Sequence, residues 1–134
     1  DADVPEIRVV NRHLERAQHL AEEFGSPLQP VTWAEAASTL EGASLLVNTT
    51  SLGMTGKPPL ELDLRSLPRT AVVNDIVYNP LMTPLLEEAE ARGNVIVDGL
   101  GMLLHQGRPG FHVWFGIDPK VTPEQQRFVE KAMK

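Results

Sequence analysis

The chain has 134 residues, of which 42% are hydrophobic and 22% charged, with a formal net charge of -6 and no cysteine. This composition is typical of one globular domain, and the lack of cysteine excludes disulfides, thiolate nucleophiles and cysteine metal sites. The negative charge argues against a nucleic-acid partner, although a local arginine pair can still hold one phosphate. No apolar run approaches the roughly twenty residues that span a bilayer, and the opening Asp1-Ala2-Asp3 does not resemble a signal peptide. We therefore expect a cytoplasmic protein with no membrane partner.

The first part of the chain alternates between strand and helix patterns. Ile7–Val10 is a short β-branched run that predicts a strand. Leu14–Phe24 has apolar residues at helical spacing, with Gly25 just after its end as a helix terminator. Residues 31–33 indicate a second short strand, and residues 34–40 a short helix.

The middle of the chain contains two apolar runs separated by a long irregular segment. Residues 45–47 and 71–73 are apolar on both faces, which is typical of buried parallel strands. Residues 52–69 are rich in glycine and proline and predict a loop.

The last part predicts three helices and one more strand. Thr83 and Pro84 have the residue types of a helix start, and the helix is expected over 83–92, before Gly93. Val95–Val97 predicts a strand. Leu100–Phe115 predicts a helix that Pro109 must break or kink. Thr122 and the proline after it open a final helix.

Hydrophobic strands that alternate with helices predict an α/β fold, a doubly wound parallel sheet with helices on both faces. Ligands bind such sheets beyond the carboxyl ends of the strands. Every predicted strand but that at 31–33 ends in short polar side chains or glycine, at Asn11-Arg12, Asn48-Thr49-Thr50, Asn74-Asp75 and Asp98-Gly99. Any one of these sites alone is best explained as a helix cap, but four in succession favour a binding cleft.

Arg12 carries the most information about a ligand. In dinucleotide-binding folds, an acidic residue at the end of the second strand binds the ribose of NAD, whereas a basic residue accommodates the 2′-phosphate of NADP. Arg12 holds that place, and Arg16 lies four residues on, which on a helix is one turn away on the same face. Two guanidinium groups can hold a phosphate from two sides. The alternative is a solvated pair that bonds Glu15 or Glu22, and the residues alone leave both readings open.

Four motifs, in order across nearly the whole chain, resemble those of the shikimate dehydrogenase family. The segment 11–17, Asn-Arg-His-Leu-Glu-Arg-Ala, is similar to the family's NADP-phosphate motif Asn-Arg-Thr-x-x-Arg/Lys-Ala, with His13 where threonine or serine is usual. The others are residues 47–54, residues 75–80 followed by Thr83-Pro84-Leu85, and residues 98–107, which form the most specific motif.

The resemblance implies a Rossmann-like NADP-binding domain of an oxidoreductase. Its reaction would be reversible hydride transfer between NADPH and 3-dehydroshikimate, giving shikimate, in aromatic amino acid biosynthesis. The implied cofactor-binding residues are Asn11, Arg12, His13, Arg16, Thr49, Thr50, Ile76, Gly99 and Met102, and the implied substrate-binding residues are Tyr78 and Gln106. Gly99 suits its place because a backbone without a side chain allows close approach of the nicotinamide ring.

The composition alone favours plainer roles for some of these residues. Met102 would be core filler. Tyr78 and Gln106 would be ordinary, partly buried polar residues. The histidines match no metal-site spacing, and hydride transfer requires no metal.

Two features expected of a working family member are missing. No glycine-rich G-x-G-x-x-G/A turn precedes Ile7, so the first strand and the turn that would hold the pyrophosphate are absent. The family's catalytic lysine and aspartate come from its substrate domain, and the lysines here lie in a loop and the tail. We therefore expect residues 1–134 to form a partial NADP-binding domain without its upstream substrate domain, with no catalytic residue and little turnover alone. Alternatives are a quinate/shikimate dehydrogenase of broader specificity and a non-catalytic nucleotide- or shikimate-sensing module.

The missing first strand also has a structural consequence. It is central in the strand order 3-2-1-4-5-6, so its loss leaves two hydrophobic strand edges unpaired. We expect a longer parent polypeptide, direct pairing of Ile7–Val10 with residues 45–47, or exchange of strands between chains in a homodimer.

Overall fold

The computed structural model describes residues 4–133, which divide into two compact units. Unit 1 comprises Asp1–Ala43 with Leu62–Pro68, and unit 2 comprises Ser44–Glu61 with Arg69–Lys134. The opening Asp1-Ala2-Asp3 and the last lysine lie outside the described residues.

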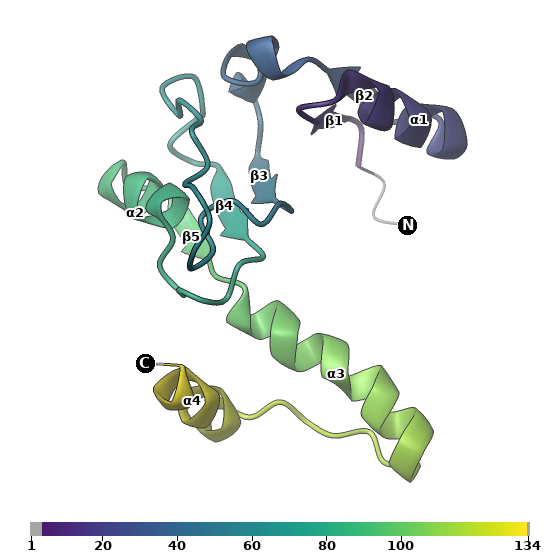
Figure 1. Ribbon diagram of the computed structural model, residues 1–134, viewed down its shortest axis with the longest axis vertical. Helices are drawn as coiled ribbons and strands as arrows, with labels where there is room; N and C mark the ends of the chain where they lie inside the picture. The colour runs from purple at the N-terminus through teal and green to yellow at the C-terminus, as the bar shows by residue number, and fades with distance from the viewer. Residues whose placement is uncertain (1–3, 134) are drawn as a thin grey trace. The chain divides into compact units, whose positions relative to one another are not determined.

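Unit 1 contains a parallel strand pair and one helix. Strand β1 (Ile7–Val10) is followed by helix α1 (Leu14–Phe24) and strand β2 (Leu28–Val31), as Figure 1 shows. The strands pair in register from Ile7 opposite Leu28 to Val10 opposite Val31. Strand β1 and helix α1 were predicted correctly, whereas the second strand begins and ends earlier than predicted.

The second strand was misplaced because of Pro30 and Thr32. Pro30 has no N–H to donate, which argues against a central strand, but an edge strand such as β2 tolerates it. The strand ends at Val31 because the Thr32 hydroxyl donates a hydrogen bond to the Glu35 carboxylate, at 2.6 Å, and the chain turns there.

The short helix predicted over 34–40 is instead two 3-10 turns, η1 (Trp33–Glu35) and η2 (Ser38–Leu40). The Ser38 hydroxyl donates to the Glu35 carbonyl oxygen at 3.0 Å. Such side-chain bonds compete with the regular helical ladder, which explains why no continuous helix forms.

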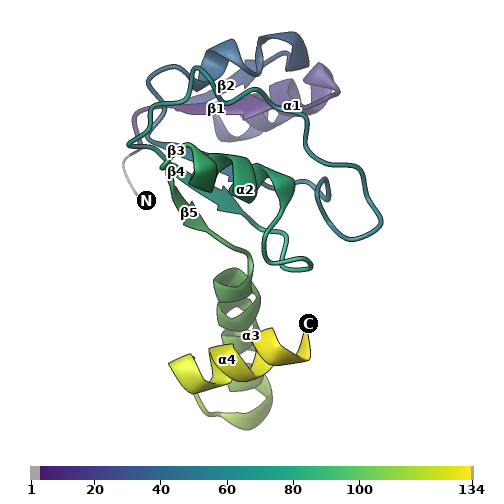
Figure 2. The ribbon, with the colours of Figure 1, turned by 90° about the vertical axis from the view of Figure 1, so that its left-hand side faces the viewer.

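Unit 2 contains a three-stranded parallel sheet in the order β3 (Leu45–Asn48), β4 (Val72–Asp75) and β5 (Val95–Val97). Helix α2 (Pro84–Ala91) packs against β4 and β5, as Figure 2 shows. The predicted start of α2 is confirmed, since the Thr83 side chain accepts a hydrogen bond from the backbone N–H of Leu86 and Pro84 is the first helical residue. The α/β class and the parallel strands are therefore confirmed.

The two faces of the β3–β4–β5 sheet differ in burial. The face toward α2 contains Val73 and Asp75, which are both completely buried. The opposite face contains exposed apolar side chains, with 56% of Leu45, 41% of Val47, 62% of Val95 and 46% of Val97 accessible to solvent. Within the described part of unit 2, α2 packs on the first face of this sheet, and the apolar side chains of the second face stay partly exposed. Alternation in a strand sends neighbouring side chains to opposite faces, so one helix buries only every second residue.

Direct pairing of β1 with β3 was one of three alternatives for the missing first strand, and the strand ladders of the described residues do not include it. The described strands form two sheets, in which β1 pairs only with β2 and β3 only with β4. One edge of β1 and one edge of β3 therefore have no ladder partner within residues 4–133.

Two further helices end the chain and pack against each other, α3 (Leu100–Phe115) and α4 (Pro123–Ala132). Pro109 was expected to break or kink this helix, and the break does not occur, because α3 runs through it as one helix of 16 residues. A proline removes only one helical hydrogen bond, and the ladder on either side of it remains. The predicted start of α4 is confirmed by a capping box, in which Thr122 and Gln125 bond each other's backbone N–H.

An arginine fastens the connection between these helices to α3. The Arg108 guanidinium donates to both carboxylate oxygens of Asp118, at 2.9 Å, and to the carbonyl oxygen of Pro119, at 2.8 Å. We expect Arg108→Ala to release this connection, raising amide hydrogen exchange in α4 while lowering stability by only about 1 kcal/mol, since the pair is partly exposed. Lys120→Ala is the matched control, and equal exchange in both variants would contradict the role given to Arg108.

Candidate functional site

The start of α1 carries the predicted phosphate-binding residues. The Asn11 side-chain oxygen accepts a hydrogen bond from the backbone N–H of His13, at 2.9 Å, and His13 is extended at φ -109° and ψ 100°. Helix α1 therefore begins only at Leu14, and Arg12 lies in the turn before it. The expectation that Arg12 and Arg16 share one helical face is wrong, because the Asn11 turn keeps Arg12 out of the helix. Both arginines still belong to the N-terminal end of α1, where the helix dipole favours an anion.

The charges of Arg12 and Arg16 are not neutralised by neighbouring acids. Both residues are exposed, and no hydrogen bond or ion pair engages either guanidinium within the described residues. Glu15 instead lies 3.6 Å from the imidazole of His13. The alternative in which the arginines bond Glu15 or Glu22 is therefore not what the structure contains.

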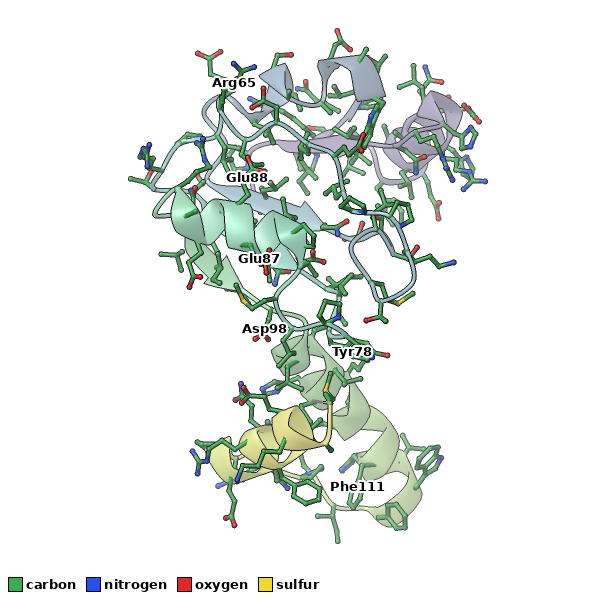
Figure 3. The ribbon with its side chains drawn as sticks, turned by 60° about the vertical axis from the view of Figure 1, so that its left-hand side comes forward. Arg65, Tyr78, Glu87, Glu88, Asp98 and Phe111 are labelled. Carbon is green, nitrogen blue, oxygen red and sulfur yellow. The ribbon has the colours of Figure 1, made fainter. Side chains whose placement is uncertain are left out.

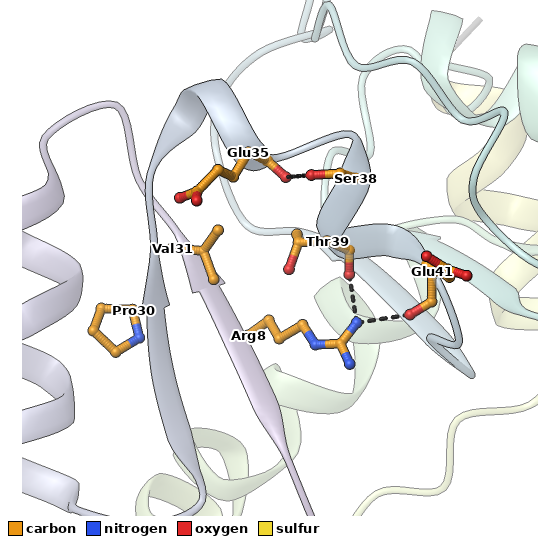
Figure 4. A pocket seen from close by; sticks show the side chains of 7 residues that line it. All are labelled: Arg8, Pro30, Val31, Glu35, Ser38, Thr39 and Glu41. Carbon is orange, nitrogen blue, oxygen red and sulfur yellow. Dashed lines mark hydrogen bonds between the residues drawn. The ribbon is translucent and has the colours of Figure 1, made fainter.

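The neighbouring Arg8 shows the opposite behaviour, although it lines a pocket of about 590 Å³ in unit 1. Its guanidinium bonds the Glu6 carboxylate at 2.5 Å and the carbonyl oxygens of Thr39 and Glu41 at 2.6 and 2.7 Å, as Figure 4 shows in part. The hydrogen bond to Glu6 raises the pKa of Arg8 and lowers that of Glu6. The Arg8 guanidinium thus holds the end of η2 to β1. Because its N–H groups already have partners, it is not available to bind an anion in the pocket.

The loop after β3 is organised by Asn48, which is only 3% exposed. Its side-chain oxygen accepts from the backbone N–H of Thr50 at 3.0 Å and from the Thr50 hydroxyl at 2.8 Å. Its amide group donates to the Leu52 carbonyl oxygen at 3.1 Å. The Thr50 hydroxyl is therefore engaged within the loop, whereas the exposed Thr49 side chain has no hydrogen-bond partner in the part of the chain that the structure describes.

The chain after β4 crosses the start of α3 at Gly99. The backbone N–H of Gly99 donates to the Val77 carbonyl oxygen at 3.2 Å. A Cβ atom at Gly99 would lie 2.3 Å from the carbonyl oxygen of Ile76 and 2.6 Å from that of Val77. The sequence reading attributed the glycine to the approach of a ring, but the contact of two backbone segments already requires it.

The other predicted residues of this region are accessible. Tyr78 is 40% exposed and lies with Asp98 at the junction between the sheet and α3, as Figure 3 shows. Met102 is 37% exposed, so the reading of it as core filler is wrong. Gln106 lies one turn further along α3 and is also exposed.

Sequence reasoning placed Asp75 at a strand end but gave it no task. Asp75 is completely buried, and its carboxylate accepts hydrogen bonds from Asn48, Val77 and Thr83. An acidic residue ending an otherwise apolar buried strand was the signal that could have identified it.

Within residues 4–133, no group of three or more histidine, aspartate or glutamate side chains is arranged to hold a metal ion. No helix of the described chain has the length and apolar character needed to cross a bilayer.

The chain is similar to known dehydrogenases, although no family model matches it. It is 62% identical over 129 residues to a shikimate dehydrogenase (NADP(+)) of Paramagnetospirillum magneticum, covering 96% of the chain and 47% of that protein. A solved quinate dehydrogenase from Corynebacterium glutamicum in complex with NAD matches with a TM-score of 0.84 and 29% identity, covering 95% of this chain and 47% of that one. A shikimate 5-dehydrogenase from Thermus thermophilus in complex with NADP(H) and shikimate matches with a TM-score of 0.77 and 36% identity, covering 96% and 46%. The chain spans about half the length of the curated relatives it matches.

Proposed function

Because the chain belongs to the shikimate dehydrogenase family, we propose that it is the NADP-binding part of an enzyme that interconverts 3-dehydroshikimate and shikimate. The observation that carries this proposal is the 62% identity to an NADP-dependent member over 96% of the chain. The uncommitted charges of Arg12 and Arg16 agree with a cofactor that carries an extra phosphate.

The residues present fit NADP at two places in the chain. Arg12 and Arg16, with Asn11 and His13, would hold the 2′-phosphate through charge-assisted hydrogen bonds at the start of α1. The nicotinamide end would lie against a second set of residues: Thr49, Thr50, Ile76, Gly99 and Met102. When bound, NADPH supplies the hydride that reduces the keto group of the substrate.

Tyr78 and Gln106 would orient the substrate ring. The Tyr78 hydroxyl and the Gln106 amide can each donate and accept hydrogen bonds, which suits a ring acid with several hydroxyl groups. Both side chains are exposed in this chain, so they are accessible to a ligand.

A further domain of the same polypeptide is part of the proposal. The end of α3 and helix α4 expose a large apolar set, with 78% of Trp114, 61% of Phe115 and 74% of Phe128 accessible. Exposed apolar surface of this kind usually marks an interface. We propose that the substrate domain covers it and supplies the lysine and aspartate for proton transfer. A homodimer that pairs through the open edges of β1 and β3 is a separate alternative for those edges, and the intact enzyme is proposed to be cytoplasmic.

Steady-state kinetics test this function. The polypeptide extended by its upstream half is expected to oxidise shikimate with NADP and to use NAD poorly. The 134-residue chain alone is expected to show little or no turnover, since it lacks the proton-transfer pair. Near-normal shikimate oxidation by the isolated chain would contradict the proposal that the proton-transfer residues lie outside it. An extended polypeptide that is inactive with NADP would contradict the proposed function.

The likeness to a quinate dehydrogenase structure in complex with NAD, with a TM-score of 0.84, favours a second candidate. A quinate/shikimate dehydrogenase of broader specificity would oxidise quinate at a comparable rate in the same assay. A non-catalytic sensing module would bind NADP or shikimate without turnover, which separates it from both enzymes.

A further inference from the structure

Asp75 is a buried charged residue that the proposed reaction leaves without a task. Its side chain is 0% exposed at the carboxyl end of β4. One carboxylate oxygen accepts from the Asn48 amide and from the backbone N–H of Val77, both at 3.0 Å. The other accepts from the Thr83 hydroxyl at 2.7 Å. No arginine, lysine or histidine side chain pairs with it among residues 4–133.

The arrangement of donors suits an aspartate at this position. Three donors converge on the side chain, and an ionised carboxylate is the side chain that can only accept. An asparagine of the same shape has one acceptor oxygen, so its N–H groups would face either the Thr83 hydroxyl, which would have to reverse and accept, or the two donors from Asn48 and Val77. Burial of a charged group without partners is costly. The three hydrogen bonds and the nearby N-terminus of α2 offset this cost for the Asp75 carboxylate.

The three partners belong to three separate segments. Asn48 holds the loop that carries Thr49 and Thr50. Val77 precedes Tyr78, and its carbonyl oxygen accepts from the backbone N–H of Gly99. Thr83 starts helix α2. One carboxylate therefore sets the relative positions of the loops after β3 and β4, which both carry residues proposed to contact the nicotinamide end or the substrate.

We infer that Asp75 is a positioning residue, whose carboxylate holds the loops after β3 and β4 in the arrangement that receives the nicotinamide half of the cofactor. This inference rests on the proposed function, because it takes NADP as the ligand. Asp75 does not touch the cofactor and acts only through Asn48, Val77 and Thr83.

Asp75→Asn in the extended polypeptide tests the inference by calorimetric titration with two probes. NADP has both halves of the cofactor, whereas adenosine 2′,5′-bisphosphate has only the half with the 2′-phosphate. We expect the Kd of NADP to rise about tenfold and the Kd of the bisphosphate to stay within twofold of wild type, because the change weakens or rearranges the hydrogen bonds that hold the loops after β3 and β4, and these loops carry residues proposed for the nicotinamide end. The KM for shikimate should rise in parallel through the displacement of Tyr78. Asp63→Asn, at an exposed aspartate that bonds Arg65, is the control and should change neither Kd.

A purely structural role would lower the melting temperature and move both Kd values together or neither, and that result would overturn the inference. If Asp75→Asn fails to fold, Thr83→Val and Thr83→Ser decide. Serine keeps the hydroxyl that donates to Asp75, and valine removes it, so NADP should bind at least about threefold more weakly to the valine variant. Equal affinities would overturn the inference. A wild-type protein that binds no NADP would instead refute the proposed function, which keeps the two failures distinguishable.

Discussion

Replacing Arg12 with alanine is expected to weaken NADP binding by about 30- to 100-fold and to leave NAD binding nearly unchanged. The expectation follows from the loss of charge-assisted hydrogen bonds to a phosphate that NAD lacks, each contributing roughly 1.5–3 kcal/mol. The Arg12 guanidinium has no acidic partner to release within the described residues, so its removal should cost the fold little. Isothermal titration calorimetry of the extended polypeptide with each cofactor measures the two Kd values directly.

Two further variants make the result specific. Arg12→Lys keeps the charge but loses the planar fork, so its affinity for NADP should be intermediate. Arg127→Ala removes one positive charge from the exposed surface of α4 and should leave both affinities unchanged. An equal loss for NADP and NAD in Arg12→Ala would rule out the 2′-phosphate role.

The second large effect is expected from Gly99→Ala. Gly99 has φ -79° and ψ -5°, which any residue can adopt, so backbone conformation does not require glycine here. The added Cβ would instead lie far inside normal contact distance of the Ile76 and Val77 carbonyl oxygens, at 2.3 and 2.6 Å. Backbone atoms cannot rotate away, and we expect a loss of about 2–3 kcal/mol in the free energy of unfolding in urea. Displacement of Val77 should also reduce turnover of the extended polypeptide with shikimate.

Gly101→Ala is the matched control, two residues further along the chain and in the first turn of α3. A Cβ at Gly101 would meet no atom within 4 Å. Alanine is also the better helix former, so this variant should be as stable as wild type or more stable by about 0.5–1 kcal/mol. Equal stability of the two variants would show that the backbone of residues 76 and 77 leaves room for a side chain at Gly99, which would contradict this prediction.

The sequence predicted best those features that depend on neighbouring residues. The starts of α2 and α4 follow from threonine followed by proline, because the cap uses atoms within three residues. The strand β2 was misplaced because Pro30 fits a strand only at the edge of a sheet. Which strands lie at an edge depends on pairing between distant residues, which the local sequence does not show. The exposure of Leu45 could not be predicted for the same reason, since it depends on which segments cover the sheet.

The candidate site divides in the same way. The residue types and spacing of Arg12 and Arg16 identified them as a candidate phosphate site, but whether Glu15 or Glu22 bonds them could not be decided from the sequence. The task of Asp75 depends on Asn48, 27 residues before it, and on Thr83, eight residues after it. No local pattern joins these positions, and only the pairing of β3 with β4 brings two of them together.

The exposed side of the β3–β4–β5 sheet also affects how tolerance to substitution can be measured. A library screened on these 134 residues would reward serine or lysine in place of Leu45, Val47, Val95 or Val97, because those changes remove apolar surface from water. In a longer polypeptide that covers the same face, the identical changes would bury polar groups without partners. Selection on the isolated segment would thus enrich variants that such a longer polypeptide could not accommodate.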